Sequence, residues 1–149
     1  MGLNPYMNRN NPWNSYRQVA TQTASPGQLV LMLFDGAVRF LEQALLGFPV
    51  EDPLERIQTI NNNILRAQDI INELNYSLDL RQGGHLAETL RGLYEYFDRR
   101  LTESNVRKTS DGIEEVLVHI RTLRDAWSSM LSQAGQTRAA QTADLCAVG

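Results

Sequence analysis

Residues 23–44 read TASPGQLVLMLFDGAVRFLEQA, a helix start followed by a long apolar helix. Ser25 can serve as the N-cap, Pro26 suits the first helical position, and Gln28 stands where a capping box has Glu or Gln. One apolar stripe is enough to dock a helix on a core. This helix carries two apolar stripes. The second stripe therefore predicts a second packing partner, which is a neighbouring helix, another subunit or a bound chain. The stripes are Leu29, Leu33, Ala37, Phe40 and Ala44, and Val30, Phe34, Val38, Leu41 and Leu45.

Three more segments show helical periodicity, and no segment shows a strand pattern. We expect helices over about 26–46, from 53 to a break at 81–84, over about 85–104, and from the N-cap Ser110 to Gly135. The second has a heptad seam, which packs helices at small crossing angles. Four long helices with short connections predict an all-α fold, an antiparallel up-down four-helix bundle. The seam residues are Ile57, Ile60, Ile64, Ala67, Ile71, Leu74 and Leu78.

The two ends of the chain differ in composition from the predicted bundle, which spans residues 25–134. Residues 1–24 form an N-terminal arm with prolines and asparagines that disfavour regular structure. Its aromatic residues Tyr6, Trp13 and Tyr16 can bury substantial area, so we expect the arm to pack on the bundle. Residues 135–149 are rich in Ala, Gln and Thr, and we expect a disordered tail.

The bulk composition is typical of an ordinary single domain. The chain has 149 residues, 14 basic and 17 acidic, with a net charge of −3. No basic run favours nucleic acid, and no apolar stretch has the length of a membrane span. The N-terminus lacks the apolar core of a signal peptide, so we expect a cytoplasmic protein without membrane insertion. The single cysteine, Cys146, has no partner for an intrachain disulfide.

The residue types that carry enzymatic chemistry are scarce. The two histidines, His85 and His119, lack the Glu-x-x-His spacing of di-iron bundles and are too few for a zinc site. Asp35 has no second titratable group nearby in sequence, so a helix–helix or arm contact beside Gly36 is the favoured interpretation over an acid–base role. We therefore expect no catalysis, no metal and no cofactor.

The sequence resembles the FliS family over roughly residues 11–131. Several matched blocks in the right order are more specific than any single motif. Phe34, where many members have Tyr, and Ser104, where Ala is usual, are mild departures. The blocks are Asn11-Pro12 with Tyr16, TASPGQLVLMLFDGA at 23–37, RAQDIINEL at 66–74, Ser77-Leu78-Asp79 ahead of Gly83-Gly84, LYEYFDRRL at 93–101 with Asn105, and Asp125-Ala126-Trp127.

The resemblance implies a non-enzymatic flagellar export chaperone with a helical bundle. Its partner would be the C-terminal segment of flagellin, which is unfolded when free and wraps around the chaperone. Binding would prevent premature polymerisation and aid delivery to the export apparatus, through the cytoplasmic domain of the export gate protein FlhA. Some members of the family also bind other flagellar regulators, and the N-terminal arm lies near the flagellin groove.

The flagellin-binding residues that we expect come from the arm, the last two helices and the turn between those helices. For the apolar helical members, core packing is an equally good interpretation, because seam and groove positions share one periodicity. The arm residue belongs to no seam. A bundle whose extra stripe meets a second copy is the competing function. The expected residues are Tyr16, Leu90, Tyr94, Phe97, Leu101, Asn105 and Trp127.

Overall fold

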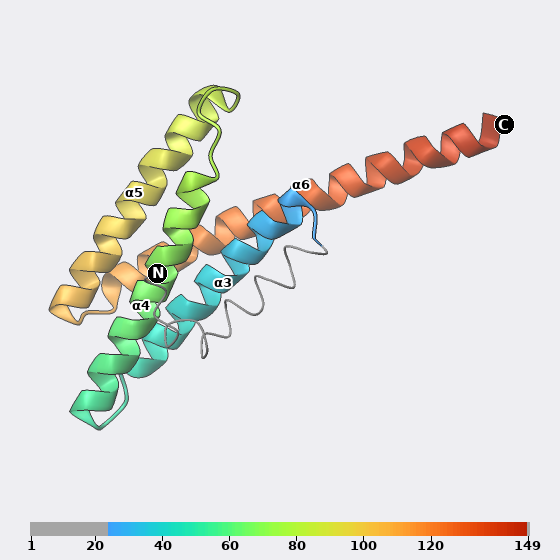
Figure 1. The fold of residues 1–149 in the computed structure, drawn as a ribbon. Helices are drawn as coiled ribbons and strands as arrows, with labels where there is room; N and C mark the ends of the chain where they lie inside the picture. Colours follow the sequence, from blue (N-terminus) through green and yellow to red (C-terminus); the bar gives the residue numbers. More distant parts are fainter. Residues whose placement is uncertain (1–23, 149) are drawn as a thin grey trace, which may run out of the picture.

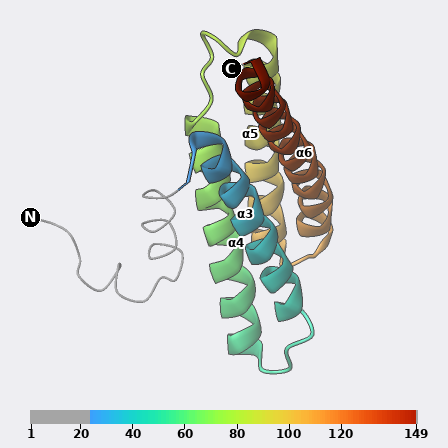
Figure 2. The same cartoon turned by 90° about the vertical axis from the view of Figure 1, so that its right-hand side faces the viewer.

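Four helices make up the part of the chain that the computed structural model describes, residues 24–148. That range contains no strand, and the prediction of an all-α four-helix bundle is confirmed. Successive helices run in opposite directions (Figures 1 and 2). α3 packs against α4 and α6, and α5 packs against the same two helices. The helices are α3 (Pro26–Gly47), α4 (Pro53–Tyr76), α5 (Gly84–Arg107) and α6 (Asp111–Val148).

The helix starts follow from the capping residues. Ser25 Oγ accepts a hydrogen bond from the backbone N–H of Gln28 at 3.2 Å, and Gln28 Oε1 accepts from the Ser25 N–H at 3.0 Å. This is the full capping box that the sequence predicts. At α4 the Asp52 carboxylate accepts from the Glu55 N–H at 2.8 Å, and the Glu55 side chain makes no return bond. The start of α4 therefore has the N-cap bond of a capping box without its return bond.

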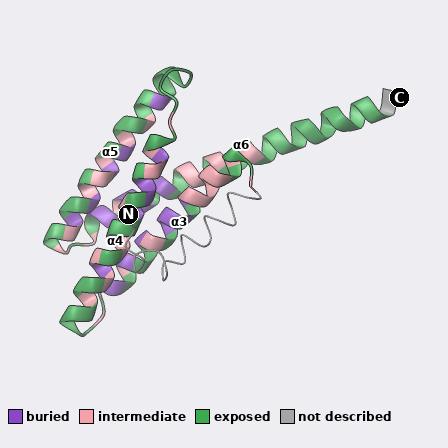
Figure 3. Ribbon diagram, viewed as in Figure 1, coloured by how far each residue is buried: buried purple, intermediate pink, exposed green. Residues whose placement is uncertain are grey.

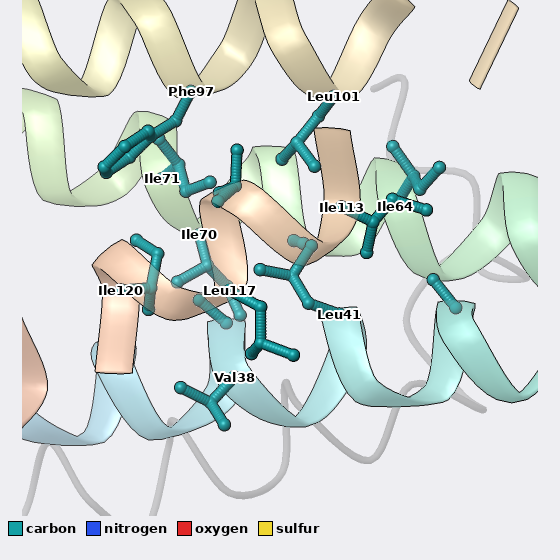
Figure 4. Close-up of a cluster of buried hydrophobic side chains, with 14 of the residues drawn as sticks. Val38, Leu41, Ile64, Ile70, Ile71, Phe97, Leu101, Ile113, Leu117 and Ile120 are labelled. Carbon is teal, nitrogen blue, oxygen red and sulfur yellow. The ribbon is translucent and has the colours of Figure 1, made fainter. Parts of the chain in front are cut away.

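The core lies between the facing sides of the four helices (Figures 3 and 4). Most of the predicted seam of α4 is buried, but Ile57, its first position, is 47% exposed, and Leu78, its last, is only partly buried. Ile70 is also buried, although it lies off the seam, because α4 packs against both α3 and α5. A helix that packs against two neighbours therefore buries a wider apolar face than a single heptad seam predicts.

The end of α6 differs from the sequence prediction. We expected the helix to end at Gly135 and a disordered tail to follow, but the helix continues through Gly135 to Val148 and projects beyond the bundle (Figure 1). Residues 132–146 are all exposed, so no packing holds this extension. Its composition explains the helix: Ala, Gln and Arg are strong helix formers, and one internal glycine costs only about 1 kcal/mol.

The proposed N-terminal arm lies almost wholly outside the described residues. This applies to its three aromatic residues, Tyr6, Trp13 and Tyr16, and to the expectation that the arm packs on the bundle. The described helices answer one further question from the sequence. Within residues 24–148, none combines the length and apolar character that crossing a membrane requires.

Candidate binding groove

An apolar groove opens at the end of the bundle where α3 and α5 begin and α4 finishes, which we call the groove end. All four helices contribute to it, and it encloses about 380 Å³. α5 and α6 diverge toward this end (Figure 1), and apolar residues of both helices line the groove there. The apolar lining consists of Val30 and Phe34 from α3, Leu74 from the end of α4, Leu78 from the turn after it, Leu86, Ala87, Leu90 and Tyr94 from α5, and Leu123, Ala126, Trp127 and Met130 from α6.

The few polar groups in the lining belong to the turn between α4 and α5. Ser77 Oγ donates a hydrogen bond to the Leu74 carbonyl at 2.7 Å. The Asp79 carboxylate accepts from the backbone N–H groups of Arg81, at 3.0 Å, and Gln82, at 3.2 Å. Because these groups already stabilise the turn, the groove offers a ligand mainly apolar contact.

Trp127 forms one wall of the groove and connects α6 to the start of α3. Its indole Nε1 donates a hydrogen bond to the Gly27 carbonyl at 2.8 Å. Its ring lies 6.5 Å from that of Phe34, tilted by 53°. The amphipathic indole therefore satisfies its polar atom inside the protein and presents apolar surface to the groove.

Tyr94 lies between this groove and a second one. Its side chain is buried, and burial raises the pKa of its phenol to about 12. The residue also lines a polar groove of about 510 Å³ between α4 and α5. Tyr94 is therefore a neutral wall residue at any physiological pH. The other residues of the polar groove are Asn72, Asn75, Gly92, Glu95, Asp98 and Arg99.

The structure separates the expected site residues into three groups. Leu90, Tyr94 and Trp127 come together in the groove. Phe97 and Leu101 are fully buried in the core (Figure 4), as the core-packing interpretation has it.

Asn105 lies near the other end of α5, away from the groove. Its Nδ2 donates to Asn61 Oδ1 of α4 at 2.9 Å. Lys108 Nζ donates to the Asn105 carbonyl at 2.6 Å and also to its side-chain oxygen. The bond to Asn61 ties the end of α5 to α4, and the bonds from Lys108 close the end of α5 itself. Tyr16, the last expected residue, lies outside the described part of the chain.

Several groove residues were missed as site residues from the sequence. Val30 and Phe34 belong to the second stripe of α3, which did signal a surplus apolar face. Leu86 is 67% exposed and Met130 47% exposed, although both lie on apolar lines of their helices. The sequence does carry a signal for these residues. The apolar spacing of α5 begins as early as Leu86 and that of α6 continues as far as Met130, beyond the part of each helix that packs in the core.

The charged residues that the sequence singled out make contacts between helices. The Asp35 carboxylate lies 3.9 Å from Arg124 of α6, on the surface, and the adjacent Gly36 is buried. The His119 ring stacks on Phe97 with centroids 5.9 Å apart. Nowhere in residues 24–148 do three or more His, Cys, Asp or Glu side chains gather in a way that could hold a metal ion.

Comparison with known proteins places these features in a family. The family described as Flagellar protein FliS matches residues 9–134. The flagellar secretion chaperone FliS of Bacillus subtilis is 31% identical over 128 residues, which cover 86% of this chain and 92% of the relative. Its namesake in Salmonella typhimurium is 36% identical over 124 residues, covering 80% and 90%. The match spans the whole bundle and every helix that lines the groove, and the chain belongs to the FliS family.

Proposed function

We propose that this protein is a flagellar export chaperone that binds the unfolded C-terminal segment of flagellin. The relatives named above are flagellar secretion chaperones, which is a role for a binding protein rather than an enzyme. The observation that carries the proposal is the apolar groove, which the described residues leave open beside the packed core. In this proposal the chaperone acts in the cytoplasm, before export.

The physical basis is shared apolar burial. A segment that polymerises by helical packing outside the cell carries apolar faces that would aggregate inside it. A chaperone without an energy source can protect such faces only by covering them with its own apolar surface, as helix-in-groove complexes do. Ordering a disordered client has an entropic cost, so the interface is expected to be large for its affinity.

Leu90, Tyr94 and Trp127 are the proposed contacts from the expected set, together with the exposed Leu86 and Met130. All five line the groove on α5 and α6. Burying a leucine or methionine that is otherwise exposed contributes about 1.5–3 kcal/mol. A client that covers several such side chains therefore gains enough free energy to offset part of its ordering cost.

The other expected residues have different places in the proposal. Phe97 and Leu101 support the groove from the core and do not line it. Tyr16 is proposed to contact the client from the arm. Asn105 contributes only if the client continues along α5 to the opposite end of the bundle.

Delivery requires further partners. We propose that the loaded chaperone binds the cytoplasmic domain of the export gate protein FlhA, and that other flagellar regulators bind the same protein. The support for both comes from the family resemblance.

The direct test of the proposed function is calorimetric titration of the protein with flagellin and with flagellin that lacks its C-terminal segment. We expect binding to the first and none to the second. Equal binding to both would exclude the C-terminal segment as the client. Light scattering at several concentrations tests the competing function, since a tight oligomer that does not respond to flagellin would favour self-association.

A further inference from the structure

Tyr94 is buried, yet its hydroxyl group makes no hydrogen bond to any group in residues 24–148. The residue is only 4% exposed. Burial alone raises the pKa of its phenol, which agrees with a hydroxyl that has no charged or hydrogen-bonding neighbour. The hydroxyl of a buried tyrosine usually finds a partner, so an exception calls for an explanation.

The comparable aromatic side chains have their polar atoms satisfied. Tyr96 Oη donates a hydrogen bond to the Glu115 carboxylate at 2.5 Å, and Trp127 Nε1 donates to the Gly27 carbonyl at 2.8 Å. Tyr76 is 89% exposed, so its hydroxyl is hydrated. Among the tyrosine and tryptophan residues of the range 24–148, only Tyr94 is both buried and unpaired.

The Tyr94 hydroxyl is accessible from outside the fold. In the part of the chain that the structure describes, Ser104 Oγ is the only fully enclosed side-chain nitrogen or oxygen atom without a partner. The Tyr94 oxygen also lacks a partner there, so it is not fully enclosed. Because Tyr94 lines both the apolar groove and the polar groove, this access lies within the grooves.

The hydroxyl is also the one donor that the side chains of the apolar groove leave unused in the described residues. Ser77 Oγ donates within the turn after α4, the Asp79 carboxylate is an acceptor, and the Trp127 N–H is bonded to α3. A peptide that enters the groove brings main-chain carbonyl groups, which lose water on burial and are costly to leave unpaired. The Tyr94 phenol keeps its proton at physiological pH and is able to donate it.

We propose that the Tyr94 hydroxyl, unpaired in the unbound protein, donates a hydrogen bond to a main-chain carbonyl of the bound client where the apolar groove meets the polar groove. The inference rests on the proposed function and deepens it. Apolar contact does not fix the position of a peptide along a groove, whereas one directed hydrogen bond does. A hydroxyl that is buried without a partner lowers stability, so the same group should cost stability in the unbound protein and contribute affinity in the complex.

The test removes one tyrosine hydroxyl at a time from α5. Tyr94→Phe keeps the ring and deletes the unpaired hydroxyl. Tyr96→Phe is the matched control, because its hydroxyl is paired with Glu115 and the residue does not line the apolar groove. Calorimetry with flagellin measures Kd, and circular dichroism measures the melting temperature of each unbound protein.

We expect Tyr94→Phe to raise Kd about three- to tenfold, and to leave the melting temperature unchanged or higher. Tyr96→Phe should do the reverse, lowering the melting temperature while Kd stays within about twofold. A similar fall in melting temperature for both variants would overturn the inference, because the Tyr94 hydroxyl would then be paired within the fold.

The binding results separate this inference from the proposed function. If the unaltered protein binds flagellin and Tyr94→Phe binds it equally well or better, the role of the hydroxyl is wrong and the proposed function stands. If the unaltered protein binds no flagellin, the proposed function fails and the inference fails with it.

Alanine substitution of each polar side chain in the client segment identifies the acceptor. The ratio of Kd between Tyr94→Phe and the unaltered protein should persist with every altered client, because a main-chain carbonyl is present in all of them. Loss of that ratio for one client would assign the acceptor to its missing side chain and overturn the main-chain bond.

Discussion

One apolar line of α5 is exposed at one end of the bundle and fully buried at the other. The line consists of Leu86, Leu90, Leu93, Phe97 and Leu101. Leu86, at the groove end, is 67% exposed, whereas Leu101 is 0% exposed. Leu101 lies toward the other end of the bundle, where α3 and α5 finish and α4 and α6 begin, which we call the closed end. Helical periodicity therefore marks an apolar face but does not say what covers it. The cover depends on the path of the neighbouring helix.

The closed end is built for close approach of α5 and α6. A Cβ atom on Gly112 would lie 2.8 Å from the Arg100 carbonyl oxygen and nearer still to Ser104 Oγ. Tyr96 donates to the Glu115 carboxylate at 2.5 Å, and Arg100 Nε lies 3.4 Å from the same group. From this junction the two helices diverge toward the groove end (Figure 1). The groove is the consequence of fixing them together at only one end.

The largest difference should appear when one leucine at each end is truncated. Leu101→Ala leaves a cavity in the core and should lower the free energy of unfolding by about 2–5 kcal/mol. Leu86→Ala removes a mostly exposed side chain and should change it by less than about 0.5 kcal/mol. Urea unfolding followed by circular dichroism measures both. Similar losses for the two variants would mean that the groove end is packed like the core.

A smaller loss of stability is expected when α5 and α6 are pushed apart at the closed end. Gly112→Ala should lower the free energy of unfolding by about 1–3 kcal/mol, because backbone and a buried side chain occupy the space of the new methyl group. Gly92→Ala, in mid-α5 with open space around it, is the control and should raise stability by up to about 1 kcal/mol. A stabilising effect of Gly112→Ala would show that α5 and α6 are less tightly held than described.

The smallest effect is expected on the pH dependence of the melting temperature, through the Glu115 carboxylate at the contact between α5 and α6. The hydrogen bond from Tyr96, followed by the charge and hydrogen bond of Arg100, lowers the pKa of Glu115 from its ordinary value of 4.5. A carboxyl with a depressed folded-state pKa stabilises the fold above the unfolded-state pKa, and this stabilisation is lost as the pH falls through the folded-state pKa. Glu115→Gln should therefore show a shallower loss of melting temperature below pH 4.5. A melting curve with the same acid dependence in both proteins would contradict this role.

Much of the fold could be predicted from the sequence, because its signals are local. The Ser25–Gln28 capping box and the apolar spacing of α3 and α4 depend on residues within one or two helical turns. The end of α6 was mispredicted, because Gly135 alone does not outweigh the helix propensity of its neighbours. The exposure of Ile57 and the burial of Ile70 depend on where α3 and α5 lie, which no spacing in α4 reveals.

The candidate site was only partly predictable for a related reason. Leu90, Phe97 and Leu101 are equivalent in spacing, yet only the first lines the groove. Trp127 was identified through the family resemblance, and its acceptor, Gly27, lies 100 residues away in the chain. The sequence therefore predicts that apolar surface is in excess, whereas the three-dimensional arrangement decides which end of the bundle leaves it uncovered.

A charge placed on one exposed leucine at each end of the bundle shows whether flagellin binds in the groove. Leu86 and Leu54 are 67% and 64% exposed, and both lie in the first turn of a helix, where Asp is well tolerated. Calorimetry with flagellin should show that Leu86→Asp raises Kd about tenfold or more, whereas Leu54→Asp, outside the groove, leaves it within about twofold, which is under 0.5 kcal/mol. Equal effects of the two variants, or a larger effect of Leu54→Asp, would contradict the claim that flagellin binds in the groove.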